Sequence, residues 1–169
     1  MGTIFLYTGN GAGKTTNALG LALRCVGHNF KVVIIQFMKG RKDIGEYMIK
    51  DRLAPEYEIH QFGLTEYVDL TNPSDKDKEI AKKGLAFARE ALKKKPHLLV
   101  LDEINLAVAV GLLEKREVLD FLSQIPEETD VVLTGRRAPS WLIDRADIVN
   151  LVVEVKAPEK MYSRIGINY

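Results

Sequence analysis

A glycine-rich segment near the start of the chain has the residue types and spacing of a phosphate-binding loop. It comprises Gly9, Asn10, Gly11, Ala12, Gly13, Lys14, Thr15 and Thr16. Glycines allow backbone N–H groups to surround phosphate oxygens, while the lysine adds a positive charge and Thr15 offers a hydroxyl to Mg²⁺. The general motif has glycine where this chain has Thr8, so the segment is a variant loop. A plain glycine turn is the alternative, but the apolar run before the loop and the helical pattern after it disfavour that interpretation.

Two carboxylates, Asp102 and Glu103, directly follow the apolar run 98–101. At the carboxyl end of a parallel strand they would face the crevice in which ligands bind, and such a pair can hold Mg²⁺. An acidic pair that merely starts a helix is the alternative. The phosphate loop in the same chain favours the metal site. Arg136 follows a third apolar run and could bind a phosphate or simply lie at the surface.

The sequence offers no evident side-chain nucleophile. His28, His60 and His97 have no carboxylate or cysteine at ligand spacing, and the single cysteine, Cys25, lies in an apolar segment. We therefore interpret all four as structural residues. The lone cysteine also excludes an intramolecular disulfide, and the expected location is a reducing cytoplasm.

The elements that must position these residues alternate between strands and helices. Short apolar runs predict strands at 3–7, 31–37, 58–62, 97–101, 130–133 and 148–155, and most of these runs are continuously apolar, as in strands buried on both faces. Helical patterns lie at 14–26, 73–95, 117–125 and 139–146, and the first of these is apolar almost all round, as in a deeply buried helix. The alternation predicts an α/β fold, a mainly parallel sheet with helices on both faces. Two irregular stretches, 39–55 and 63–72, are expected to carry ligand contacts.

Length and composition fit one domain of ordinary soluble type. The chain has 169 residues, of which 46% are hydrophobic and 28% charged. A formal net charge of +1 gives no global field that would gather nucleic acid or an anionic membrane. The internal apolar run 106–113 is well short of the ~18 residues that a membrane-spanning helix needs. We therefore expect a single P-loop domain over 1–169 without nucleic-acid or membrane partners.

Beyond the loop, an ordered set of segments resembles the ATP:corrinoid adenosyltransferases of the CobA/BtuR type. Besides 8–16, the set comprises 36–40, 45–46, 101–103, 134–136, 144–147 and 166–169, so it spans nearly the whole chain. The resemblance implies a RecA-like P-loop fold, usually as a homodimer, and an electron-donating reductase as partner. It implies transfer of the 5′-deoxyadenosyl group of ATP to the Co(I) of a reduced corrinoid, with release of triphosphate.

The same resemblance implies roles for individual residues. Segment 9–16 would hold the triphosphate, Thr15 and Glu103 would bind Mg²⁺ as the cofactor, and Arg136 would lie near the phosphates. Lys14, Glu103 and Arg136 are therefore the candidate catalytic residues. The absence of a side-chain nucleophile is compatible with this reaction, because reduced cobalt is itself a strong nucleophile and the protein need only position the reactants and stabilise the leaving charge.

The chain departs from the family pattern at several positions. Ala12 stands where the family commonly has a lysine, and Leu64 and Glu66 stand where it has aromatic residues that displace the lower cobalt ligand. The candidate corrinoid contacts are Met38, Leu64 and Tyr67. Two alternatives stay open: a small P-loop kinase or ATPase, and a module that binds ATP and delivers a corrinoid without turnover.

Overall fold

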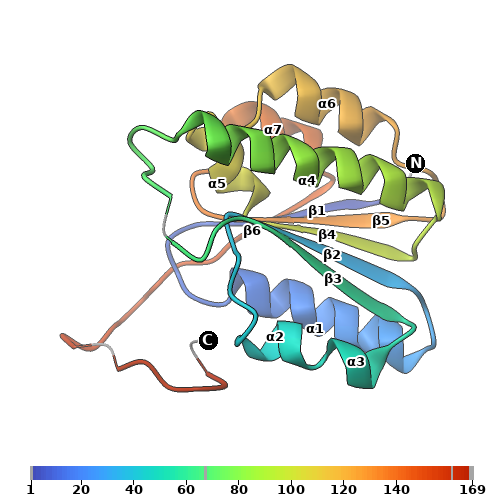
Figure 1. Cartoon of the computed structure of the whole chain (residues 1–169), viewed down its shortest axis with the longest axis horizontal. Helices are drawn as coiled ribbons and strands as arrows, with labels where there is room; N and C mark the ends of the chain where they lie inside the picture. The colour runs from blue at the N-terminus through green and yellow to red at the C-terminus, as the bar shows by residue number, and fades with distance from the viewer. Residues whose placement is uncertain (1, 67, 161, 168–169) are drawn as a thin grey trace.

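The computed structural model describes residues 2–66, 68–160 and 162–167. Within these residues a six-stranded sheet has the order β3-β2-β4-β5-β1-β6, and all neighbouring strands are parallel (Figure 1). The strands are β1 (Ile4–Thr8), β2 (Val32–Phe37), β3 (Tyr57–Phe62), β4 (Leu98–Asp102), β5 (Asp130–Thr134) and β6 (Ile148–Leu151). The predicted parallel α/β sheet is confirmed.

Helices cover both faces of the sheet (Figure 1). One face carries α1 (Lys14–Gly27), α2 (Gly45–Met48) and α3 (Lys50–Leu53), and the other carries α4 (Asp75–Lys93), α5 (Ile104–Ala109), α6 (Lys115–Ser123) and α7 (Ser140–Arg145). Successive strand residues alternate between the two faces, so Val33 and Ile35 pack towards α4 while Val32 and Ile34 pack towards α1. The central strands are continuously apolar because both of their faces are covered.

The first helix is less buried than its sequence predicts. Its buried residues are Lys14, Ala18 and Ala22, whereas Leu23 is 59% exposed. Small alanine side chains let the helix lie close to the sheet, and the larger apolar residues are left on its flanks. The prediction of a deeply buried helix was therefore wrong.

Three short helices and one edge strand also differ from the predictions. Helices α2 and α3 occupy part of the stretch 39–55 that was expected to be irregular, and α5 lies in the apolar segment after the acidic pair, which was not predicted to be helical. Strand β6 ends at Leu151, and all of its residues are exposed. It pairs only with β1 at the edge of the sheet, so the expectation of a strand over 148–155 buried on both faces was wrong.

The functional segments meet where the parallel strands end. The segments that follow β1, β2, β4 and β5 all leave the sheet at its carboxyl edge, at the left of Figure 1. After β6 the chain extends away from the sheet on the same side of the molecule (Figure 1). No helix among the described residues is long and apolar enough to cross a membrane.

Candidate active site

The loop 9–16 turns sharply between the end of β1 and the start of α1. Gly9 and Gly13 have left-handed φ angles of 105° and 104°, which glycine adopts without steric cost. A Cβ atom at Gly9 would lie 2.3 Å from the carbonyl oxygen of Val152, because the segment after β6 passes against the loop. The Gly11 N–H donates a hydrogen bond to that same oxygen at 2.9 Å. Gly9 and Gly11 therefore allow the segment after β6 to pack closely against the loop. The phosphate-loop motif alone does not indicate this role of the two glycines.

Thr8 accounts for the variant form of the loop. It is the last residue of β1, and its φ is not in the left-handed region that would call for glycine. Its hydroxyl accepts a hydrogen bond from the Ala138 N–H at 3.3 Å, which joins the loop to the segment after β5. Threonine at this position thus leaves the backbone geometry of the loop intact.

The three residues predicted to be catalytic lie within electrostatic reach of one another. Lys14 is buried, and its ammonium donates to the Gly11 carbonyl oxygen. Burial and then the nearby Arg136 charge lower the pKa of Lys14, while Glu103 acts in the opposite direction. Arg136 itself is exposed. Two cations therefore flank the end of the loop, where a polyphosphate would be attracted.

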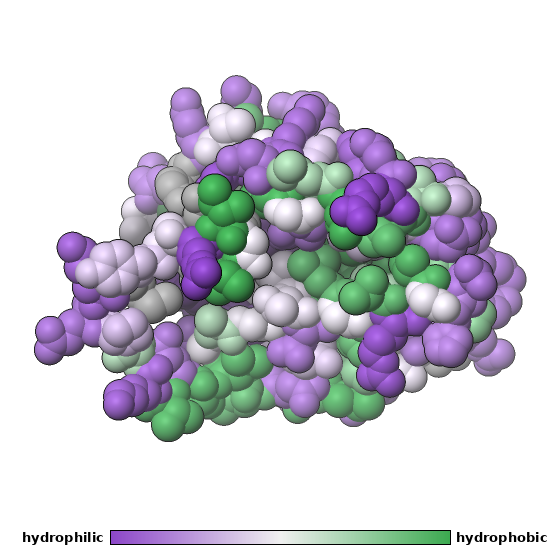
Figure 2. Space-filling model, turned by 90° about the horizontal axis from the view of Figure 1, so that it is seen from below, coloured by the Kyte–Doolittle hydropathy of each residue, from purple (hydrophilic) through white to green (hydrophobic). Residues whose placement is uncertain are grey.

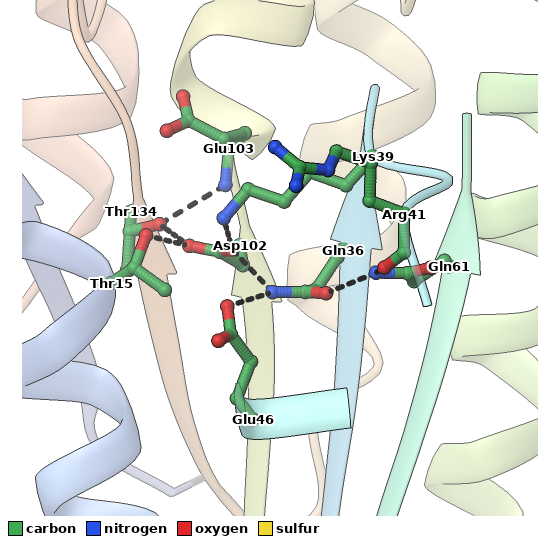
Figure 3. A network of polar contacts seen from close by, with 9 residues as sticks. All are labelled: Thr15, Gln36, Lys39, Arg41, Glu46, Gln61, Asp102, Glu103 and Thr134. Atoms are coloured by element: carbon green, nitrogen blue, oxygen red, sulfur yellow. Dashed lines mark hydrogen bonds and ion pairs between the residues drawn. The ribbon is translucent and has the colours of Figure 1, made fainter. Parts of the chain in front are cut away.

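Asp102 is the centre of a buried polar network (Figure 3). Its Oδ1 accepts hydrogen bonds from the hydroxyls of Thr15 at 2.7 Å and Thr134 at 2.6 Å. Its Oδ2 accepts from the Gln36 amide at 3.1 Å and from the Lys39 ammonium at 2.6 Å. Both oxygens are thus occupied by donors, so this carboxylate orients the Thr15 hydroxyl at the start of α1.

The charge state of Asp102 follows from these partners. Burial by itself raises the pKa of the carboxyl, but the Lys39 charge and the hydrogen bonds from Lys39, Thr134 and Thr15 outweigh burial and hold that pKa below its ordinary value. Burial likewise lowers the pKa of Lys39, and the attraction of Asp102 outweighs it, so the pKa of Lys39 lies above its ordinary value. The pair is therefore ionised at neutral pH.

Glu103 has a different environment from its neighbour. It adopts a left-handed φ of 65° just before α5, and its N–H donates to the Thr134 hydroxyl at 3.0 Å. Its Oε2 is buried and has no hydrogen-bond partner within the part of the chain that the structure describes. Burial and then the Asp102 charge raise the pKa of Glu103. A desolvated carboxylate oxygen without a donor is suited to bind a cation.

The available oxygen ligands fit Mg²⁺ bound together with a nucleotide. Residues 2–66, 68–160 and 162–167 contain no group of three or more His, Cys, Asp or Glu that could hold a metal. Mg²⁺ does not need such a group, because it commonly takes one or two carboxylates, substrate phosphates and waters. The Thr15 hydroxyl and the unpaired Glu103 oxygen are protein ligands of that kind.

Asn105 joins the ends of two strands beside Glu103. It is fully buried, and its amide donates to the carbonyl oxygens of Tyr7 and Gly135, each at 3.1 Å. A Cβ atom at Gly135, which has a φ of 132°, would lie 3.2 Å from Glu103 Oε2. Because Gly135 has no side chain, there is room for the Glu103 carboxylate. Asn105 fixes the backbone of Gly135, which directly precedes Arg136.

Gln36 connects Asp102 to the segment that follows β2 (Figure 3). Its amide nitrogen donates to both Asp102 and Glu46, the latter at 3.2 Å, and its oxygen accepts from Gln61 at 3.0 Å. The Tyr57 hydroxyl donates to the backbone carbonyl of Glu46 at 3.0 Å. Helix α2 is therefore tied to the acidic pair by a single buried amide and to β3 by a tyrosine.

The candidate corrinoid contacts lie in two adjoining segments after β2 and β3. Met38 packs partly against the core, and its N–H donates to the Phe62 carbonyl oxygen at 2.9 Å. A Cβ atom at Gly40 would lie 2.7 Å from the Leu64 backbone, so the two segments are in close contact. Leu64 is half-buried beside them, and Tyr67 lies outside the described residues. The corrinoid role of these residues stays a prediction.

Sequence reasoning assigned no role to Gln36, Lys39, Glu46 or Asn105, although the first three lie in segments used for the family resemblance. One signal was available for Gln36, which is a polar residue inside the otherwise apolar and fully buried strand β2. Asn105 likewise interrupts an apolar run. Nothing in the sequence pairs Lys39 with Asp102, because their contact depends on two strands being neighbours.

Comparison with solved structures identifies a protein of similar fold. The KaiC-like protein PH0186 from Pyrococcus horikoshii aligns with a TM-score of 0.63 over 94% of this chain and 75% of its own, at 17% identity. At that identity the likeness concerns the fold alone, and it agrees with the predicted RecA-like P-loop architecture.

Comparison of sequences identifies the family to which the chain belongs. A corrinoid adenosyltransferase from Pseudomonas aeruginosa is 35% identical over 92% of this chain and 76% of its own length. One from Escherichia coli K12 is 33% identical over 99% of this chain and 86% of its own. The family described as ATP:corrinoid adenosyltransferase BtuR/CobO/CobP matches residues 1–169. The chain belongs to the ATP:corrinoid adenosyltransferase family.

Proposed function

We propose that this protein transfers the 5′-deoxyadenosyl group of ATP to the cobalt(I) of a reduced corrinoid and releases triphosphate. The observation that carries the proposal is the meeting of the phosphate loop, the acidic pair and Arg136 at one edge of the sheet, in a chain that matches the family throughout its length. Neither a phosphoryl-transfer enzyme nor a passive delivery module is favoured by its relatives.

The proposed reaction balances without a nucleophile from the protein. The cobalt(I) electron pair attacks C5′ of ATP, a Co–C bond forms, and the C5′–O bond breaks with its electron pair leaving on the triphosphate. Lys14 and the N–H groups at the start of α1 stabilise that leaving charge, and Arg136 adds a cation at the same end. Mg²⁺ held by Thr15 and Glu103 would supply further positive charge to the phosphates.

Asp102 supports this site through Thr15. Because its two oxygens already accept four hydrogen bonds, it holds the Thr15 hydroxyl in place rather than contacting the nucleotide. Lys39 keeps the Asp102 carboxylate ionised, and the hydrogen bond from Gln36 helps to fix its orientation. In this proposal Asp102 is a positioning residue and Glu103 the metal ligand.

The corrinoid is proposed to approach from the segments after β2 and β3. Met38 and Leu64 offer apolar surface there, and Tyr67 follows in the sequence. A reductase that supplies the electron for cobalt(I) and a homodimeric assembly are further parts of the proposal, and both rest on family membership.

An anaerobic assay tests the function directly. The protein is mixed with ATP, Mg²⁺ and chemically reduced cobalamin, and the Co–C bond is followed by its light-sensitive absorbance change. Adenosylcobalamin and inorganic triphosphate should form in equal amounts. Formation of ADP or orthophosphate without adenosylation would favour a kinase or ATPase, and ATP binding without any product would favour a delivery module.

A further inference from the structure

Two pockets flank helix α1, one on each side of its contact with the sheet. The first is lined by Leu19 and Leu23 and by residues of α2, α3 and β3. The second, which we call the β1-side pocket, has a volume of about 430 Å³ and is lined by Tyr7 of β1 and by Asn17, Gly20 and Arg24 of α1, among others. Figure 2 is seen from the side of α1 and shows hydrophilic and hydrophobic residues interspersed on this surface. The reaction steps described above do not use the β1-side pocket.

The β1-side pocket opens directly onto the phosphate loop. Gly13, the last glycine of the loop, and Thr16 in the first turn of α1 both line it. The Asn17 amide donates to the Gly13 carbonyl oxygen at 2.9 Å, which holds this side chain at the mouth of the pocket. The amide has a second N–H that a ligand can use.

A cation lies at the other end of the β1-side pocket. Arg24 is exposed and stands seven residues after Asn17, about two helical turns. Helical side chains lean towards the N-terminus of their helix, so the long Arg24 side chain extends back towards the phosphate loop. None of the described residues that line the pocket is acidic. The pocket therefore suits an anionic group.

Gly20 leaves the space between these two polar side chains open. Asn17, Gly20 and Arg24 follow one another at spacings of three and four residues, so they share one face of α1. A Cβ atom at Gly20 would have no other atom within 4 Å, and the φ of this glycine is outside the left-handed region. Packing of the chain thus gives no reason for glycine inside a helix, where it is unfavourable. Room for a ligand gives such a reason.

The proposed reaction determines which end of ATP faces the β1-side pocket. C5′ must face the segments after β2 and β3, because the corrinoid is proposed to approach from there. In the sheet order, β1 lies on the opposite side of β4 and β5 from β2 and β3. The phosphates therefore run from C5′ along the loop towards β1, and the terminal phosphate lies beside the pocket.

Adenosyl transfer leaves the terminal phosphate untouched. The ATP bond that breaks is C5′–O, and its electron pair leaves on the α-phosphate. A kinase must bring the terminal phosphorus atom to an acceptor, whereas here the chemistry sets no upper limit on the length of the leaving group. Space and a cation beyond the third phosphate are compatible with a longer one.

We propose that the β1-side pocket receives a fourth phosphate, so that adenosine 5′-tetraphosphate serves as an adenosyl donor. The additional phosphate accepts hydrogen bonds from the Asn17 amide and the Arg24 guanidinium. The cobalt(I) electron pair forms the Co–C bond, the C5′–O bond breaks, and its electron pair leaves on inorganic tetraphosphate. The inference rests on the proposed function and extends its substrate class to longer adenosine 5′-polyphosphates.

Binding of inorganic polyphosphates tests the pocket without any turnover. Calorimetric titration compares the magnesium complexes of triphosphate and tetraphosphate. We expect the wild-type protein to bind tetraphosphate about tenfold more tightly, since hydrogen bonds to a charged group are among the stronger ones. Arg24→Gln should reduce this preference to about threefold or less, because only the guanidinium charge is lost. Arg116→Gln removes an exposed cation from α6, on the other face of the sheet, and should keep the full preference.

Filling the pocket is a second and independent test. Gly20→Leu places a side chain in open space, so the preference for tetraphosphate should disappear. The melting temperature should not fall, because leucine is a better helix former than glycine. Gly27→Leu is the matched control: Gly27 ends the same helix, a Cβ atom there also has no other atom within 4 Å, and the residue does not line the pocket.

The anaerobic assay with adenosine 5′-tetraphosphate in place of ATP tests the substrate. Adenosylcobalamin and inorganic tetraphosphate should form in equal amounts. Turnover with ATP but none with adenosine 5′-tetraphosphate would overturn the proposal, as would a wild-type protein without a preference for tetraphosphate. A preference that persists in both Arg24→Gln and Gly20→Leu would assign it to the loop and likewise overturn the pocket. If ATP itself gives no adenosylcobalamin, the proposed function fails, while the polyphosphate titrations still decide whether the pocket binds a fourth phosphate. Melting curves check that each variant is folded.

Discussion

Replacing Asp102 with asparagine removes the charge on which four side chains converge. Asparagine keeps the size of the side chain but offers one acceptor oxygen and one N–H₂ donor. The hydroxyls of Thr15 and Thr134 can rotate to accept from the amide, whereas the Lys39 ammonium has no acceptor to offer. The amide oxygen must therefore face Lys39, and a full ion pair at 2.6 Å becomes a hydrogen bond to a neutral group.

The size of the effect follows from burial. Breaking a buried ion pair by removing one partner typically costs about 3–5 kcal/mol. The Lys39 side chain is 28% exposed, so water recovers part of that cost. We expect Asp102→Asn to lower the free energy of unfolding by about 2–3 kcal/mol, or the melting temperature by roughly 4–12 °C for a chain of this size.

The effect should depend on pH in a known direction. The pKa of Asp102 lies below its ordinary value in the folded protein, so its stabilisation is present above the ordinary pKa of about 4 and is lost as the pH falls through the folded value. Asparagine does not titrate. The difference in stability between wild type and Asp102→Asn should therefore shrink below about pH 4.

Urea unfolding at neutral and acidic pH measures these quantities. A double-mutant cycle with Lys39→Met should give a coupling of at least about 1 kcal/mol, because the second change removes a charge that has lost its partner. Asp144→Asn, at an exposed position on α7, serves as a control that should change stability by less than about 0.5 kcal/mol. Additive effects of the two network changes, or an Asp102→Asn protein as stable as wild type, would refute the argument.

Three further outcomes are expected. Lys14→Ala should abolish adenosylation, since cationic contacts to a leaving group contribute about 2–4 kcal/mol in the transition state, and near-normal turnover would exclude this role. Glu103→Gln should weaken Mg²⁺-dependent activity yet raise the metal-free melting temperature by about 2–4 °C, because burial and the Asp102 charge raise the pKa of Glu103 and its ionised form opposes folding above that residue's ordinary pKa. A lower melting temperature would contradict that reasoning. Leu64→Ala should leave ATP affinity unchanged and depress adenosylation per folded molecule; a loss of thermal stability alone would assign Leu64 to loop packing.

The phosphate loop and the acidic pair could be predicted because their determinants are local. Glycines, lysine and threonine follow one another between a strand and a helix, and the two carboxylates stand at the end of the central strand β4. The parallel sheet could be predicted for a similar reason, since burial on both faces leaves a continuous apolar run.

The different surroundings of Asp102 and Glu103 could not be predicted. It depends on Lys39 and Gln36, which come from the end of β2, some sixty positions earlier in the chain, and meet Asp102 only because β2 and β4 are neighbours. The resemblance favoured Glu103 as the metal ligand, and the structure adds that Asp102 accepts four hydrogen bonds whereas one oxygen of Glu103 has no partner among the described residues.

The short helices α2 and α3 and the exposed face of α1 could not be predicted, for two different reasons. Helices α2 and α3 have four residues each, too few to show a periodic pattern. The face of α1 with Leu19 and Leu23 carries the same residue types as a core-facing surface, and only the arrangement of α2 and α3 leaves it open as a pocket wall.

The register between β2 and β4 limits insertions and deletions within β2. Gln36 on β2 is the direct register partner of Asp102 on β4. Deleting or inserting one codon within Val32–Phe37 would turn the amide to the opposite face and bring an apolar residue opposite the carboxylate. A deletion scan should therefore find β2 intolerant of changes in length. The same is expected at Gly40, where the segment after β2 lies in close contact with the Leu64 backbone. Apolar residues of β2 can therefore be exchanged for one another, whereas Gln36 and the length of the strand are fixed by the carboxylate on β4.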